Sequence, residues 1–145
     1  MDDSDKLRAN ARLVVEELGP LSGIDFGFDR ESVKWLEGYI ERLRLSGEFR
    51  NTEAGRKFAS VFGSYLGECV IHCHGGAWTL RDGVWCVAFD KRNAVFPVNK
   101  VAKQIDAGIE EGIDSFFASI PIMFPAQGDA SRAAPRRPWW NIFGS

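Results

Sequence analysis

The stretch AWTLRDGVWCVAF, residues 77–89, contains the strongest local fold signal in the chain. Large apolar side chains alternate with smaller or polar ones on both sides of Asp82-Gly83, a pair that is typical of two-residue hairpin turns. Residues 77–81 and 84–89 are therefore predicted to form two antiparallel strands joined by a tight turn.

Two further strands are expected beside this hairpin. Residues 70–74, VIHCH, alternate in the same way, and Gly75-Gly76 after them would turn the chain back. Residues 94–96 follow a polar loop and stop at Pro97. Together these segments predict a four-stranded antiparallel meander.

The turns set a register for the predicted sheet. Because a slip of one residue would exchange the two faces, a register that gathers the large apolar side chains on one face is favoured. It pairs Cys73 with Trp78, Ile71 with Leu80, Leu80 with Trp85, Trp78 with Val87 and Val87 with Phe96.

The two faces of the predicted sheet differ in character. One is a core face, made of Ile71, Cys73, Trp78, Leu80, Trp85, Val87, Phe89 and Phe96. The other is semi-polar and is left open to solvent, a partial cover or a partner: Val70, His72, His74, Ala77, Thr79, Arg81, Val84, Cys86, Ala88 and Val95.

Three amphipathic helices are predicted before the sheet. Each follows a residue that caps helices well, and each stops at glycine or proline. Glycines inside the third helix, among them Gly63 and Gly67, indicate close packing against another backbone. The first helix begins at Ser4 and stops at Gly19-Pro20, the second follows Asp29 and stops at Gly47, and the third follows Asn51 or Thr52 and stops near Gly67.

Two shorter helices are predicted after the sheet, over residues 98–109 and 115–120, the second capped by Asp114 and stopping before Pro121. Runs of helices and strands, rather than their alternation, are typical of the α+β class. We therefore expect one α+β domain over residues 1–124, a linker over 125–138 and an aromatic tail over 139–145.

Composition and charge narrow the classes of partner. The 145 residues are 45% hydrophobic and 26% charged, close to the averages of folded domains. The part from Pro125 onward has three arginines and one aspartate, a net charge of +2. Because the whole chain has a net charge of −2, residues 1–124 have a net charge of −4. An acidic body binds phosphate backbones poorly, so nucleic acid is disfavoured as a partner.

The amino terminus and the cysteines favour a cytoplasmic location. Residues 1–5, MDDSD, are acidic, whereas a secretory signal begins with a basic region and an apolar run. No stretch approaches the roughly 18 apolar residues of a spanning helix. The three cysteines are most simply explained as reduced thiols.

A cluster of cysteines and histidines raises two chemical alternatives. Every cysteine and histidine of the chain lies between residues 69 and 86. A metal site would use Cys69, His72, His74 and Cys86, and a thiol enzyme would use Cys86 with His72 and His74.

Strand geometry argues against both alternatives. On a strand, His72 and His74 share a face that Cys73 does not. Cys86, two strands from His72, would lie roughly 10 Å away. Phosphate-binding loops, dinucleotide fingerprints and nucleophile elbows are also missing from the sequence. We expect no catalytic residue, no metal and no cofactor, with the thiol- or metal-dependent enzyme kept as the alternative.

The tail WWNIFGS, residues 139–145, has no periodic context that would bury it. It can fold back on its own domain, or dock into another protein with aromatic side chains as hot spots. It can also contact an anionic membrane weakly, because tryptophan and arginine favour that interface. The expected binding residues are Trp139, Trp140, Phe143, Arg136 and Arg137.

Two further segments carry a resemblance. Residues 62–68, FGSYLGE, and 96–101, FPVNKV, on either side of a tryptophan-bearing sheet, resemble a family of small uncharacterised bacterial domains. The resemblance covers about residues 52–120 and rests on glycines, apolar positions and one proline. It implies a bacterial, cytosolic, non-catalytic module, and no activity or site residue comes with it.

The sequence therefore favours a non-catalytic protein-binding or adaptor module that uses its aromatic tail, its exposed sheet face or both. The expected partner is another protein or a second copy of this chain. An immunity protein that neutralises a toxin and an accessory factor of a secretion system would both fit this profile.

Overall fold

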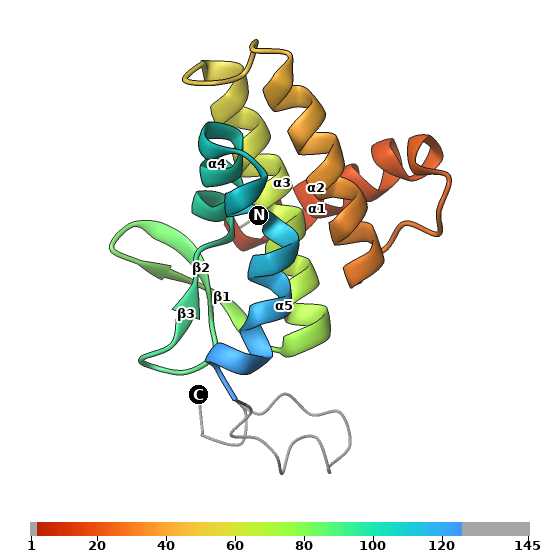
Figure 1. The fold of residues 1–145 in the computed structure, drawn as a ribbon. Helices are drawn as coiled ribbons and strands as arrows, with labels where there is room; N and C mark the ends of the chain where they lie inside the picture. Colours follow the sequence, from red (N-terminus) through yellow and green to blue (C-terminus); the bar gives the residue numbers. More distant parts are fainter. Residues whose placement is uncertain (1–2, 126–145) are drawn as a thin grey trace.

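Helix α3 is the element around which the other helices pack. The computed structural model describes residues 3–125. Helices α1, α2, α4 and α5 all contact α3, and the small sheet lies to one side of these helices (Figure 1). The elements are α1 (Asp3–Ser22), α2 (Arg30–Leu45), α3 (Glu53–His74), β1 (Ala77–Arg81), β2 (Val84–Ala88), β3 (Ala94–Val95), α4 (Pro97–Ala107), the 3₁₀ turn η1 (Ile109–Glu111) and α5 (Ile113–Met123).

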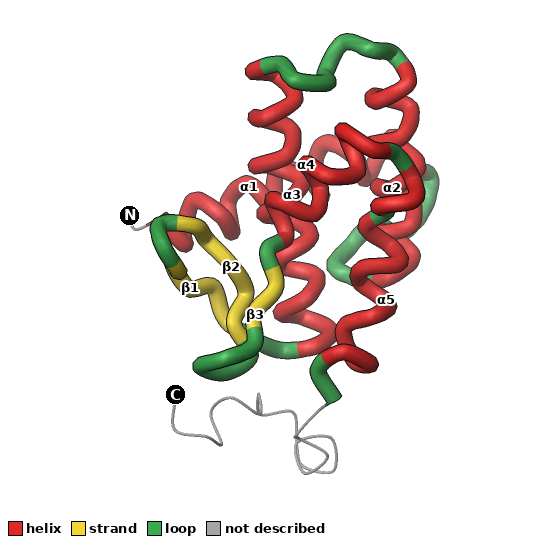
Figure 2. The backbone as a smooth tube through the Cα atoms, turned by 60° about the vertical axis from the view of Figure 1, so that its left-hand side comes forward, coloured by secondary structure: helices red, strands yellow, loops and turns green. Residues whose placement is uncertain are grey.

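The expected four-stranded meander is wrong, because residues 70–74 are helical. They form the last part of α3, and the sheet has three antiparallel strands in the order β1-β2-β3 (Figure 2). The apolar face of α3 continues through Cys69 and Val70, both fully buried. The helix ends where Gly75 takes a φ of 89°. A segment as short as residues 70–74 fits a strand period and a helix period equally well. Burial against the other helices favours the helix.

The register is correct within the hairpin and wrong outside it. Leu80 lies opposite Trp85 and Trp78 opposite Val87, as expected. The expected pairs Cys73–Trp78 and Ile71–Leu80 do not exist, because residues 71 and 73 belong to α3. Val87 lies opposite Val95 rather than Phe96, so the register between β2 and β3 differs by one residue from the expected one.

Only part of the expected core face of the sheet is core. Val87 and Phe89 are buried, but Leu80 is 52% exposed and Phe96 is also exposed. The sheet reaches past the helices (Figure 1), so the outer part of the same face stays exposed among the residues that the structure describes.

The expected helix starts are mostly confirmed, and the expected stops are less accurate. Asp29 caps α2 by accepting a hydrogen bond from the Ser32 backbone N–H at 2.9 Å, and Thr52 caps α3 through the Gly55 N–H at 3.0 Å. Helix α5 begins after Gly112 rather than at an Asp114 cap. Helices α1 and α5 both continue past the prolines that were expected to end them, Pro20 and Pro121, for about two residues.

Two glycines of α3 allow close contacts, Gly63 with the backbone of α4, as expected, and Gly67 with a side chain instead of a backbone. A Cβ at Gly63 would lie 2.5 Å from the Val98 Cα and 2.9 Å from its backbone nitrogen. A Cβ at Gly67 would lie 2.2 Å from the ring of Trp78. The first glycine lets α4 approach α3, and the second lets the hairpin do so.

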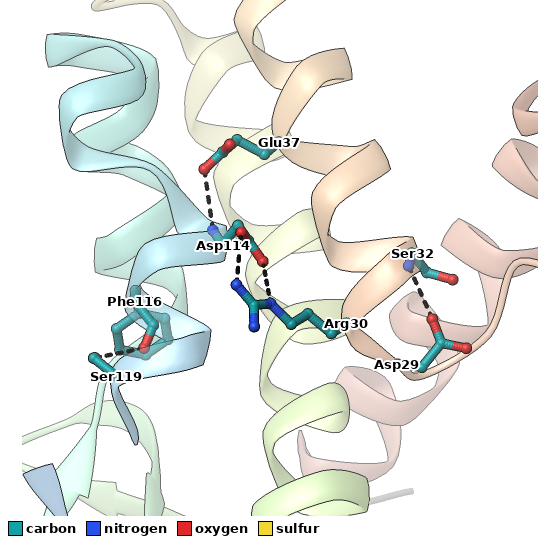
Figure 3. A network of polar contacts seen from close by, with 7 residues as sticks. All are labelled: Asp29, Arg30, Ser32, Glu37, Asp114, Phe116 and Ser119. Carbon is teal, nitrogen blue, oxygen red and sulfur yellow. Dashed lines mark hydrogen bonds and ion pairs between the residues drawn. The ribbon is translucent and has the colours of Figure 1, made fainter. Parts of the chain in front are cut away.

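Polar contacts join α5 to α2, as Figure 3 shows, and α5 to α4. Arg30 pairs with Asp114 at 3.1 Å, and the Glu37 carboxylate accepts the Asp114 backbone N–H at 3.1 Å. The buried Gln104 side chain donates to the Glu37 carbonyl at 2.9 Å and accepts the Ile113 N–H at 3.1 Å. Neighbouring helices therefore satisfy the first N–H groups of α5, which has no side-chain cap of its own.

None of the helices in residues 3–125 has both the length and the apolar content needed to cross a bilayer.

Candidate functional site

Most of the cysteines and histidines lie at the end of α3. Cys69, His72, Cys73 and His74 belong to its last two turns, whereas Cys86 lies on β2. Successive residues of a helix point about 100° apart, so the four side chains spread around α3. The expectation that His72 and His74 share a face is therefore wrong.

The two histidines pack against different elements. The ring of His72 is exposed and stacks on Phe28, with ring centroids 4.7 Å apart. Its Nε2 lies 3.8 Å from a carboxylate oxygen of Glu68. The ring of His74 instead contacts Phe117 of α5 at 4.7 Å, and burial lowers its pKa. A catalytic pair of histidines is not assembled.

Burial disfavours the thiolate form at every cysteine. Cys69 and Cys86 are buried, and Cys73 is exposed beside the Phe28 carbonyl. Burial raises the pKa of all three thiols. The Cys86 thiol donates to the Thr79 carbonyl at 3.4 Å. A nucleophilic thiol needs the opposite shift of its pKa, so no cysteine here is activated.

The proposed metal ligands are not brought together either. Within residues 3–125, no three side chains among histidine, cysteine, aspartate and glutamate are grouped so that they could hold a metal ion. Cys69 is buried in the helical core and Cys86 lies in the sheet, so the set Cys69, His72, His74 and Cys86 does not form a site.

We expect only Cys73 to react quickly with a thiol reagent such as DTNB in the native protein. Cys69 and Cys86 are shielded from solvent and should react only after unfolding. A Cys73→Ser variant should therefore lose the fast phase, whereas Cys86→Ser should keep it. Fast labelling that disappears in Cys86→Ser would restore the thiol-enzyme alternative.

The end of α3 has a structural role that the sequence did not reveal. The Trp78 indole N–H donates to a carboxylate oxygen of Glu68 at 2.8 Å, and its ring lies over Gly67. Glu68 is only 9% exposed. This contact fixes β1 on α3. This contact is not apparent from the sequence, because the predicted helix ends near Gly67, and Gly67 and Glu68 are then not placed together on α3.

Beyond this contact lies an apolar surface, which we call the hairpin end and define as Leu80, Val84 and Trp85 around the turn Asp82-Gly83. Leu80 and Val84 are 52% and 41% exposed, and Trp85 is half-buried. Both turn residues have a positive φ, as in a type I′ turn. The turn lies outside the helices, at the left of Figure 1.

The hairpin end has apolar side chains on both faces, and Arg81 lies opposite Val84 on one of them. Leu80 lies opposite Trp85, and the two share one face of the hairpin. Val84 precedes Trp85 on β2 and so points to the other face. In the described residues, the outer edge of β1 has no strand beside it.

The tail residues that were expected to bind partners cannot be placed. Trp139, Trp140, Phe143, Arg136 and Arg137 lie outside the described residues.

In comparisons with known proteins, no family model, curated protein or solved structure matches this chain. The described residues define an α+β domain with an exposed apolar hairpin end. The resemblance to small uncharacterised bacterial domains therefore stays a prediction.

Proposed function

We propose that this protein is a non-catalytic protein-binding or adaptor module and that the hairpin end is one of its contact surfaces. The observation that carries the proposal is the exposure of Leu80 and Val84 on opposite faces of one hairpin. Single exposed leucines are common on any surface, but apolar side chains on both faces of one turn are more typical of a contact site.

The contact between Trp78 and α3 prepares the hairpin for binding. Its ring over Gly67 and its hydrogen bond to Glu68 hold β1 in one orientation. Arg81, the last residue of β1, donates to the Asp90 carbonyl at 2.7 Å and so joins β1 to the loop before β3. A surface that is already ordered loses less conformational entropy when it binds.

The chemistry of the hairpin end indicates the kind of partner. Leu80 and Val84 would enter an apolar groove, and the exposed Asp82 between them would lie at its rim. The edge of β1 that has no neighbouring strand within residues 3–125 can in addition form backbone hydrogen bonds with an extended segment. The partner is therefore a protein with an apolar groove or an extended apolar segment.

The alternative of a thiol- or metal-dependent enzyme has less support. His72 and His74 contact different elements, Cys86 is buried in the sheet, and burial raises the pKa of the Cys86 thiol. No observation in the described residues favours that reaction class.

The proposal is tested with a double variant of the hairpin end, Leu80→Ser with Val84→Thr, and a matched control, Leu45→Ser. Leu45 is a 68% exposed leucine at the end of α2, distant in sequence from the hairpin. We expect the double variant to reduce the amount of a protein that co-purifies with the full chain by at least about tenfold, because hot spots dominate binding. The control should retain it.

The double variant should unfold within about 1 kcal/mol of the wild type, since exposed substitutions change stability little. Equal co-purification with the double variant and with the control would remove the hairpin end as a contact surface. Loss of self-association in the double variant alone, measured by sizing, would identify the partner as a second copy.

A further inference from the structure

We infer that the outer edge of β1 pairs with the same edge of a second copy of this chain, so that the two three-stranded sheets continue into each other. The inference rests on the proposed function and deepens it, because the second copy supplies the extended apolar segment that the hairpin would bind. Three observations support it: the backbone groups at this edge, the side chains that the pairing brings together, and the contrast between the two edges of the sheet.

The backbone groups of two residues face the outer edge of β1. In a hairpin with a two-residue turn, the residues that flank the turn exchange backbone hydrogen bonds, and bonded and non-bonded pairs then alternate along the strands. Arg81, Thr79 and Ala77 therefore turn their N–H and C=O groups toward β2. Trp78 and Leu80 turn theirs to the outer edge, where the described part of the chain supplies no further strand (Figure 2).

These outward groups fit a second copy of the same edge. When two β1 strands run antiparallel about a two-fold axis at Thr79, Trp78 of each copy lies opposite Leu80 of the other. Each of these pairs exchanges two backbone hydrogen bonds, so every N–H and C=O that faces outward finds a partner. An axis at Leu80 would instead place Trp78 opposite Asp82. An axis at Trp78 would place Leu80 opposite Gly76. Asp82 and Gly76 both have a positive φ and cannot continue a strand.

The side chains that this register brings together are compatible. Trp78 and Leu80 share one face of the hairpin, so the exposed Leu80 of each copy packs beside Trp78 of the other. On the other face Thr79 meets Thr79, a favourable cross-strand pair, and Arg81 meets Ala77. Arg81 is the only charged residue of β1, so the pairing places no like charges opposite each other.

The two edges of the sheet differ in the way that this pairing requires. Edge strands are normally protected against pairing by shortness, proline or charge. Strand β3 has such protection, because it covers two residues and Pro97 begins α4 soon after it. Strand β1 covers five residues without a proline or a lysine, and Leu80 on it is exposed. The edge of β1 is therefore the one that is suited to pairing.

The small size of the contact makes the dimer weak. Strand β1 has five residues, and two strands of this length meet over about 17 Å. This contact lies below the roughly 1,200 Å² of standard interfaces, in the range of transient associations. We therefore expect a dissociation constant on the order of 100 µM and rapid exchange between one and two copies.

Amide hydrogen exchange of the full wild-type chain tests the pairing without any substitution. It is measured by NMR at about 20 µM and at about 1 mM, on either side of the expected dissociation constant. The amides of Trp78 and Leu80 should exchange about threefold more slowly at the higher concentration, because the second copy supplies their acceptors. The amide of Thr79, which faces β2, should exchange equally at both. Equal rates at the two concentrations for Trp78 and Leu80 would overturn the inference.

A charge swap at position 79 tests the two-fold axis. Thr79→Glu and Thr79→Lys each place like charges directly opposite one another in the dimer, so each variant alone should stay monomeric in sizing at about 1 mM. An equal mixture should recover the dimer, because a carboxylate then faces an ammonium group. The matched controls, Ser60→Glu and Ser60→Lys at an exposed position of α3, should each dimerise like the wild type. A dimer in either Thr79 variant alone, or a mixture that stays monomeric, would overturn the inference.

Failure of the inference and failure of the proposed function give different results. A chain that stays monomeric at every concentration overturns the pairing of two copies. The proposed function still stands in that case if the double variant Leu80→Ser with Val84→Thr loses a co-purifying protein that the Leu45→Ser control retains.

Discussion

Gly63→Ala should lower the free energy of unfolding by about 2–3 kcal/mol, although alanine is the better helix former. A Cβ at this position would lie 2.5 Å from the Cα of Val98, so α4 would have to move away from α3. A backbone atom cannot rotate out of the way as a side chain can. The measurement is chemical denaturation of the wild type and the variant.

A matched control is available in α2. A Cβ at Gly38 would meet nothing nearer than the Arg42 guanidinium, at 3.8 Å. Gly38→Ala should therefore raise the free energy of unfolding by about 0.5–1 kcal/mol, the ordinary gain for alanine in a helix. Equal effects at the two positions would show that α3 and α4 do not approach each other as described.

Trp78→Ala is expected to cost about 3 kcal/mol and to release the hairpin from α3. The substitution removes a partly buried ring from its place over Gly67 and leaves the Glu68 carboxylate without its donor. Partner binding should also weaken, because the hairpin end would lose its fixed orientation. Denaturation and co-purification of the same variant measure the two effects.

A double-mutant cycle with Glu68→Leu separates the hydrogen bond from the packing. Glu68→Leu alone should cost about 1–3 kcal/mol, because the indole N–H loses its acceptor. If the hydrogen bond is present, the effects of Glu68→Leu and Trp78→Ala should fall short of additivity. Strictly additive effects would mean that the two side chains do not interact.

The hairpin could be predicted from the sequence because its determinants are local. Asp82-Gly83 selects the turn, and a two-residue turn fixes the pairs Leu80–Trp85 and Trp78–Val87 without help from the rest of the chain. The caps Asp29 and Thr52 could be predicted for the same reason, since each bonds an N–H three residues along.

The limit of α3 could not be predicted, because a tertiary contact decides it. Residues 70–74 alternate like a strand, and Gly75-Gly76 suits a hairpin turn as well as a helix end. What selects the helix is burial of Cys69 and Val70 in the core, which is visible only once the other helices are placed. In such cases tertiary packing overrides the secondary structure that the local sequence pattern favours.

The error at residues 70–74 carried over to the candidate site. On a strand, His72 and His74 would have faced the same way toward Cys86, whereas on a helix they contact Phe28 and Phe117 separately. The hairpin end was missed because Leu80 was assigned to the core face. The exposure of Leu80 depends on how far the sheet extends past the helices. A local sequence pattern contains no information about that distance.

The most direct test of the account is a photo-crosslinking measurement at position 84 of the full chain. A photoreactive amino acid replaces Val84 in one sample and Leu45 in another, and both are irradiated in cells that make the protein. The account predicts adducts from position 84 to a partner protein and none from position 45. Position 84 yielding no more adduct than position 45 would contradict the claim that the hairpin end is a binding surface.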